Sequence, residues 1–155
     1  MKLSSVLISA FSVLALTGCD VFSGTSRTVT VSQLPQAPLV VRALKSVPGV
    51  QKVTQHEVPP RSFWTLPEGI VREPAFQQFS FSTGTVGGTL ETKQDSKGVR
   101  TLNLYSFWMN HTPPKAKFDE ARSLLDAAYL SLRRADPALP PPSELEESLT
   151  RYPSN

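Results

Sequence analysis

Few residues in this sequence could do covalent chemistry, and the most distinctive is the only cysteine, Cys19. The thiolate form of this side chain is a good nucleophile. An uncharged, mostly apolar stretch precedes it, and the small residues Thr17 and Gly18 stand directly before it. A single cysteine cannot form an internal disulfide, so the hydrophobic core alone must stabilise the folded part of the chain.

Residues 1–18 have the organisation of an export signal. Lys2 supplies a short positive start, residues 3–14 form an uncharged apolar run, and small residues end the segment. A helix that crosses the bilayer core of ~30 Å needs ~20 apolar residues, and this run is shorter. We therefore expect residues 1–18 to be cleaved and exclude them from the fold.

Leu16-Thr17-Gly18-Cys19 resembles the lipobox of bacterial lipoproteins, with an aliphatic residue three positions before an obligatory cysteine. This resemblance implies a diacylglycerol thioether on Cys19, cleavage after Gly18 by signal peptidase II, and in many bacteria a further palmitate-type acylation of the new amine. It also implies a membrane as partner, with the protein facing the periplasm. Asp20 resembles the inner-membrane retention signal of enteric-type lipoproteins, which favours the inner over the outer membrane.

The remaining candidate groups do not form a recognisable catalytic or metal-binding pattern. His56 and His111 lie in different segments, and neither has a second histidine three or four residues away, so we predict no metal site and no cofactor. The chain has no Gly-x-Ser-x-Gly motif, and the acidic cluster at residues 144–147 is predicted to be a solvated helix face. The sequence therefore predicts a protein that is not an enzyme.

Phe63 and Trp64 are the most suggestive candidates for binding a partner. They lie within residues 59–75, which hold four prolines and no periodicity and are predicted to form a long loop. Exposed aromatic side chains are typical anchors of protein interfaces. The alternative is that both side chains fold back as a lid over the sheet.

The elements that must position these residues follow from the hydrophobic pattern. Apolar residues at helical spacing form one stripe from about Lys115 to Ala135. A shorter apolar face over residues 38–47 predicts an earlier helix, and Ser143 to Glu146 has the spacing of a capping box for a last helix to Arg151. Alternating or β-branched segments predict strands over residues 27–33, 50–58, 76–83, 89–93 and 99–109.

This element order predicts an α+β fold, a two-layer sandwich with a mostly antiparallel sheet of about four to five strands and two helices on one face. Residues 43–53 resemble the helix-to-strand junction of ferredoxin-like domains, including heavy-metal-associated ones, which implies a strand–helix–strand start. Those metal-binding domains carry Cys-x-x-Cys before the helix, where this chain has Gln33-Leu34-Pro35-Gln36-Ala37-Pro38, so the metal function does not carry over.

The chain thus divides into a signal peptide (1–18), a lipid-anchored tether (19–26), an α+β domain (27–135), and a Pro-rich segment with a short C-terminal helix (136–155). Without Lys2 the chain has 15 basic and 13 acidic side chains and no run of like charge, so nucleic acid is not a predicted partner.

The leading functional hypothesis is a non-enzymatic, membrane-anchored lipoprotein of the cell envelope that binds another envelope protein. One alternative is a lipoprotein that binds a small ligand in a pocket between sheet and loop. The other is an inhibitor or immunity lipoprotein that blocks an exported toxin.

Overall fold

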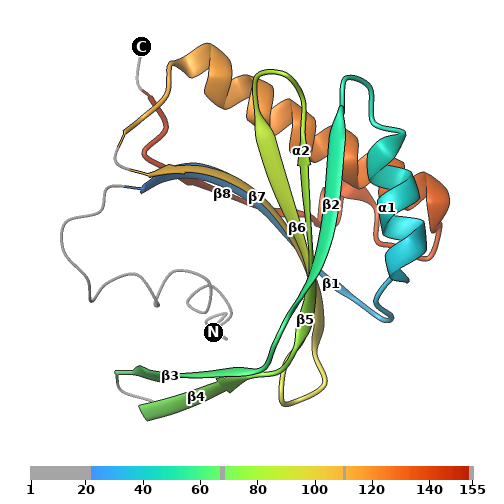
Figure 1. Ribbon diagram of the computed structural model, residues 1–155, viewed down its shortest axis with the longest axis vertical. Coiled ribbons are helices and arrows are strands. Elements are labelled where there is room, and N and C mark those ends of the chain that lie inside the picture. The colour runs from blue at the N-terminus through green and yellow to red at the C-terminus, as the bar shows by residue number, and fades with distance from the viewer. Residues whose placement is uncertain (1–21, 67–68, 110, 154–155) are drawn as a thin grey trace.

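The computed structural model describes residues 22–66, 69–109 and 111–153, and it confirms the α+β prediction. A curved six-stranded antiparallel sheet carries two helices on one face, and a separate two-stranded hairpin projects from one end (Figure 1). The sheet strands are β1 (Phe22–Val31), β2 (Lys52–Val58), β5 (Phe76–Ser82), β6 (Gly87–Gln94), β7 (Arg100–Met109) and β8 (Glu146–Thr150); the helices are α1 (Ala37–Lys45) and α2 (Lys115–Ala135); the hairpin is β3 (Arg61–Thr65) and β4 (Gly69–Glu73).

The strand order in the sheet is β2-β5-β6-β7-β1-β8, and every neighbouring pair is antiparallel. Four antiparallel pairings separate β1 from β2, so these two strands run in the same direction. The predicted strand–helix–strand start is therefore present as β1-α1-β2. Its two strands are not adjacent, because β5, β6 and β7 lie between them.

The core lies between the helices and the sheet. Helix α2 has the bounds that its apolar stripe predicted, and every member of that stripe is buried: Phe118, Ala121, Leu124, Leu125, Ala128 and Leu132. A Cβ at Gly88 would lie 2.6 Å from the ring of Phe81 and 2.9 Å from the side chain of Leu125. Only glycine at this position of β6 leaves room for both side chains.

The prediction of a loop over residues 59–75 is wrong, because the segment forms the hairpin β3–β4. Three of the prolines that suggested a loop fall outside the two strands: Pro59, Pro60 and Pro74. The fourth, Pro67, lies outside the described residues. Gly69 takes a φ of +79° at the start of β4, a conformation that favours glycine. Proline therefore delimits these strands rather than interrupting them.

The predicted C-terminal helix is also wrong. The 3₁₀ turn η2 (Pro142–Glu144) has no side-chain cap, and the chain continues as β8 at the edge of the sheet. Pairing with β1 supplies β8 with backbone partners. Glu147 of β8 also forms ion pairs of 2.8 Å with Arg27 of β1 and with Arg122 of α2. These distant partners outweigh the local helix signal and give the sheet six strands instead of four or five.

Strand β1 begins at Phe22, five residues before the expected Arg27, and takes in residues that we assigned to the tether. These residues pair with the last part of β7, from Phe22 opposite Met109 onward. Gly24 permits this pairing, because a Cβ there would lie 2.7 Å from the carbonyl oxygen of Ser106. Residues 19–21 lie outside the described part of the chain.

We expect Leu125→Asp to unfold the domain, because an unpaired carboxylate in the core costs roughly 3–5 kcal/mol. Leu125 is fully buried, whereas Leu130 on the same helix is exposed. Leu130→Asp is therefore the matched control and should retain the wild-type melting temperature in circular dichroism. A cooperative wild-type melt of Leu125→Asp would contradict the assigned core.

Candidate functional site

The sheet face opposite the helices is polar, and the strand register arranges its side chains in rows. One row carries a hydroxyl side chain on every strand of the six-stranded sheet, in spatial order Thr54, Ser80, Thr89, Tyr105, Ser26 and Ser148. The buried apolar side chains in the middle of the sheet, such as Phe79, Leu90 and Leu104, point the other way, toward α1 and α2. We call this polar surface the open face.

A hydrogen-bonded network occupies the middle of the open face. Glu91 is buried, and its Oε1 accepts hydrogen bonds from Tyr105 (2.9 Å) and from the Gln78 amide (3.0 Å). Burial raises the pKa of the Tyr105 phenol, and the negative charge of Glu91 raises it further. Tyr105 therefore remains protonated at physiological pH and acts as a hydrogen-bond donor.

Lys93 extends this network to the hairpin. Its Nζ lies 2.8 Å from Glu91 Oε2, 2.9 Å from Glu73 Oε1, and 4.2 Å from the centre of the Phe76 ring. Arg61 of β3 binds the other oxygen of Glu73 at 2.5 Å. Burial raises the pKa of Glu73, but hydrogen bonds and charge from Lys93 and Arg61 outweigh it and leave the pKa below its usual value. The two carboxylates and two cations balance, and they attach the hairpin to the sheet.

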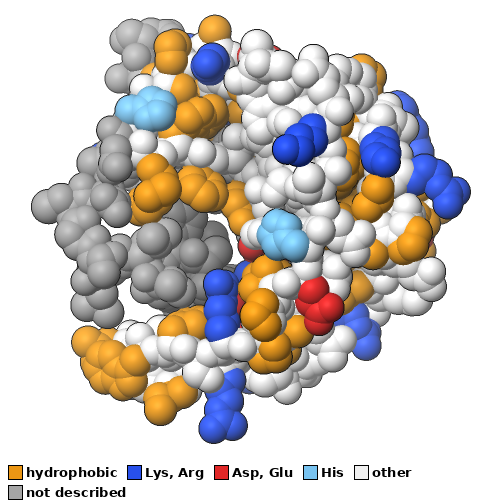
Figure 2. Space-filling view, in the orientation of Figure 1, with side chains coloured by type: hydrophobic (Ala, Val, Ile, Leu, Met, Phe, Trp, Pro, Cys, Tyr) orange, Lys and Arg blue, Asp and Glu red, His pale blue; other side chains and the backbone are white. Residues whose placement is uncertain are grey.

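The hairpin exposes a patch of large apolar side chains. Trp64 is 58% exposed, Leu66 76% and Ile70 71%. Trp64 and Ile70 are direct cross-strand neighbours, so their side chains share one face of the hairpin. We call Trp64, Leu66 and Ile70 the hairpin patch; the hairpin's apolar side chains gather at the lower left of Figure 2.

The structure separates the two aromatic residues that the sequence singled out. Phe63 and Trp64 are adjacent in β3, so their side chains point to opposite faces of the hairpin. Phe63 pairs with Val71, and both are partly buried. Sequence reasoning missed Leu66 and Ile70, although the aromatic and β-branched residues within 61–65 and 69–73 could have suggested two short strands.

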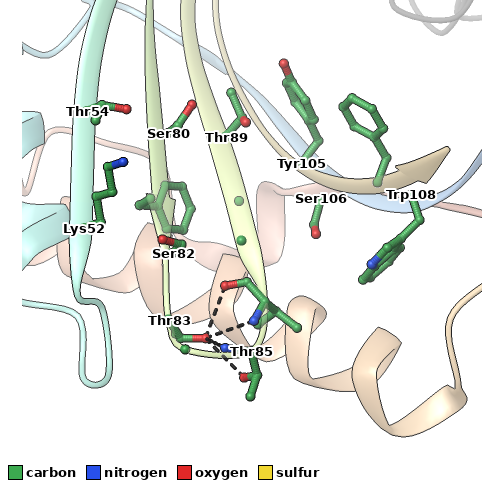
Figure 3. Close-up of a pocket in the computed structure, with 16 residues that line it drawn as sticks. Lys52, Thr54, Ser80, Ser82, Thr83, Thr85, Thr89, Tyr105, Ser106 and Trp108 are labelled. Atoms are coloured by element: carbon green, nitrogen blue, oxygen red, sulfur yellow. Dashed lines mark hydrogen bonds between the residues drawn. The ribbon is translucent and has the colours of Figure 1, made fainter.

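A hollow of about 590 Å³ opens at one end of the open face. The β6–β7 pairing stops at Thr89 opposite Tyr105, while β7 continues to Met109 alongside β1. The two strands thus diverge, and the hollow lies where they part (Figure 3). Thr83 holds the turn at its floor, because its hydroxyl accepts hydrogen bonds from the backbone N–H groups of Thr85 and Val86.

Three apolar side chains lie at the overhanging end of β1 and β7: Phe22, Phe107 and Met109. The rings of Phe22 and Phe107 meet edge to face with centroids 6.2 Å apart, and Phe107 stacks on Tyr105 at 5.5 Å. Phe107 is 52% exposed and Met109 50%. We call these three residues the strand-end patch.

The other residues considered for chemistry are dispersed. His56 contacts Gln78 on the open face, and His111 lies beside the Met109 carbonyl. Residues 144–147, expected as one helix face, are divided between two elements: Glu144 ends η2, and Glu146 and Glu147 begin β8. Within residues 22–66, 69–109 and 111–153, no three His, Cys, Asp or Glu residues are grouped so that they could hold a metal ion. Cys19 lies outside this part of the chain.

Neither a scan against protein-family models nor a search of curated proteins found a match to this chain. Among the described residues, no helix combines the length and apolar character needed to cross a membrane.

The ion pairs of Glu73 lead to a pH prediction for the hairpin. The pKa of Glu73 is lowered in the folded state. The carboxylate therefore stabilises the fold fully when the pH is above its ordinary pKa of 4.5, and this stabilisation is lost as the pH falls through the lower pKa of the folded state. We expect amide protection factors in β3 and β4 to drop in this acid range before those of β6. NMR hydrogen exchange measures them.

Glu73→Gln should lower hairpin protection at neutral pH and remove most of this acid response. Glu57→Gln, at an exposed position of β2, is the control and should leave both unchanged. Unaltered hairpin protection in Glu73→Gln would show that these ion pairs do not hold the hairpin.

Proposed function

We propose that this protein is a lipid-anchored, non-enzymatic component of the cell envelope that binds another envelope protein through the hairpin patch. One observation carries the binding proposal: Trp64, Leu66 and Ile70 are all more than half exposed on one hairpin. The lipid anchor rests on the lipobox-like residues before Cys19.

The hairpin patch has the composition of a binding anchor. Large apolar side chains grouped on a surface often mark interaction sites, and tryptophan is enriched among residues that dominate binding energy. Arg72 is exposed in the same hairpin, on the face that it shares with Trp64 and Ile70. A partner would therefore offer an apolar groove with a carboxylate at its rim.

The ion pairs of the hairpin support the same proposal. A two-stranded hairpin is marginally stable by itself, but here Arg61 and Glu73 pair across its two strands, and Lys93 of β6 binds Glu73 and so joins the hairpin to the sheet. A patch that is already ordered loses less conformational entropy on binding. The network has a structural role that explains the buried Glu91 and the half-buried Glu73 without catalysis, which is consistent with a binding protein.

The hollow favours a second candidate function, the binding of a small polar ligand. Its lining includes Lys52, Tyr105 and the hydroxyl groups of Thr54, Ser80 and Thr89. An inhibitor or immunity lipoprotein would differ from the first proposal only in the identity of its protein partner.

Photo-crosslinking in cells tests the hairpin patch. A crosslinking amino acid at position 70 should give one discrete adduct, and the same residue at exposed position 130 on α2 should give none. With the captured partner purified, Trp64→Ser should weaken binding roughly 30-fold, the effect of losing about 2 kcal/mol. Unchanged affinity, or equal adducts from both positions, would reject the hairpin patch and favour the small-ligand function.

Metabolic labelling tests the anchor. Labelled palmitate should enter the wild type but not Cys19→Ser, because only the thiol can form the thioether. Fractionation of the labelled wild type should place it with the inner membrane, as Asp20 favours. Equal labelling of Cys19→Ser would contradict the lipoprotein proposal, and sedimentation with outer-membrane porins would reject the inner-membrane assignment.

A further inference from the structure

The start of β1 limits how far the folded domain can stand from the lipid. Cys19 and Phe22 are three residues apart in the sequence, and Phe22 is the first residue of β1. Three fully extended residues span at most roughly 11 Å. If Cys19 carries the lipid, as the proposed function requires, the end of the sheet lies within that distance of the acylated residue.

The strand-end patch is located at this end of the sheet. Phe22 pairs with Met109, and Phe107 pairs with Gly24, so the three apolar side chains lie on one face of the sheet at the end where β1 begins. Phe107 is 52% exposed and Met109 50%, so both are accessible to a partner surface. In Figure 2 apolar side chains gather over this part of the molecule.

A positive charge lies at the same end of the sheet. Arg151 follows Thr150, which pairs with Gly24, and the side chain of Arg151 is exposed. A cation at a sheet end that also exposes apolar side chains suits an interface with anionic headgroups.

We propose that the strand-end patch rests in the headgroup region of the bilayer that holds the lipid on Cys19, with Phe107 and Met109 as its main contacts. The short connection keeps the patch at high effective concentration near the bilayer, so a weak apolar contact suffices. The anchor and the patch together then hold the domain in one orientation. The hairpin lies on the same side of the molecule in Figure 1 and is the competing candidate for lipid contact.

Spin labels on the full lipidated protein, reconstituted in vesicles of phosphatidylethanolamine and phosphatidylglycerol, test this proposal. The lipid consumes the thiol of the only cysteine, so Met109→Cys or Phe107→Cys introduces the only free thiol. We expect labels at both positions to gain several-fold more collisions with oxygen, and to lose collisions with a water-soluble nickel chelate, when vesicles replace detergent. Both residues are half exposed, so these variants should fold, which circular dichroism verifies.

Two exposed apolar positions serve as controls. Val99 precedes β7 at the opposite end of the strand, roughly 33 Å from Met109 at 3.3 Å per residue. Leu130 lies on α2. Labels at Val99→Cys and Leu130→Cys should remain accessible to the nickel chelate in vesicles.

Several outcomes would overturn the proposal. A label at position 109 that stays accessible to the nickel chelate rejects it, and one shielded from both reagents indicates a protein contact instead. Absence of lipid on Cys19 rejects it together with the proposed anchor. A label at Ile70→Cys distinguishes the hairpin patch from the strand-end patch. If that label gains collisions with oxygen in vesicles, the hairpin patch contacts lipid and is not the protein-binding site. The strand-end proposal is decided by the label at position 109 alone.

Discussion

The pairing of β1 with β7 is the constraint on which the other features of this structure depend. It runs over ten residue pairs, from Phe22 opposite Met109 to Val31 opposite Arg100. The β6–β7 pairing is shorter and ends at Thr89. The difference in length leaves β1 and β7 overhanging, which creates the hollow and the strand-end patch. The same pairing brings the start of the fold to within three residues of Cys19.

Charged side chains connect elements of the fold in addition to backbone pairing. On the helix side, the buried Arg27 links β1 to Asp126 of α2 and to Glu147 of its paired strand β8. On the open face, Lys93 links β6 to the hairpin through Glu73. Each of these cations contacts two carboxylates, which offsets the cost of removing charge from water. Their role is to set the positions of α2, β8 and the hairpin relative to the sheet.

These constraints leave two apolar surfaces with different physical settings. The hairpin patch projects from the sheet on a two-stranded hairpin that the Lys93–Glu73 ion pair joins to β6, and it is suited to enter a groove of another protein. The strand-end patch lies flat beside the expected lipid anchor and is suited to a bilayer surface. The open face between them is hydroxyl-rich, and the charges in its middle are paired with one another. A protein held in this way would carry the hairpin close to the membrane surface.

The sequence alone determined the α+β class, the bounds of α2 and the central strands, because the apolar periodicity that buries their side chains is local. It also singled out Trp64 by residue type. Tertiary structure decided the rest: β8 and the first half of β1 are polar segments that become strands through ladder partners far away in the chain. The hairpin patch forms only because the β3–β4 register places Ile70 opposite Trp64. The same register puts Phe63 on the other face of the hairpin. Which apolar side chain stays exposed depends on which face of a strand another element covers, and no local pattern contains that information.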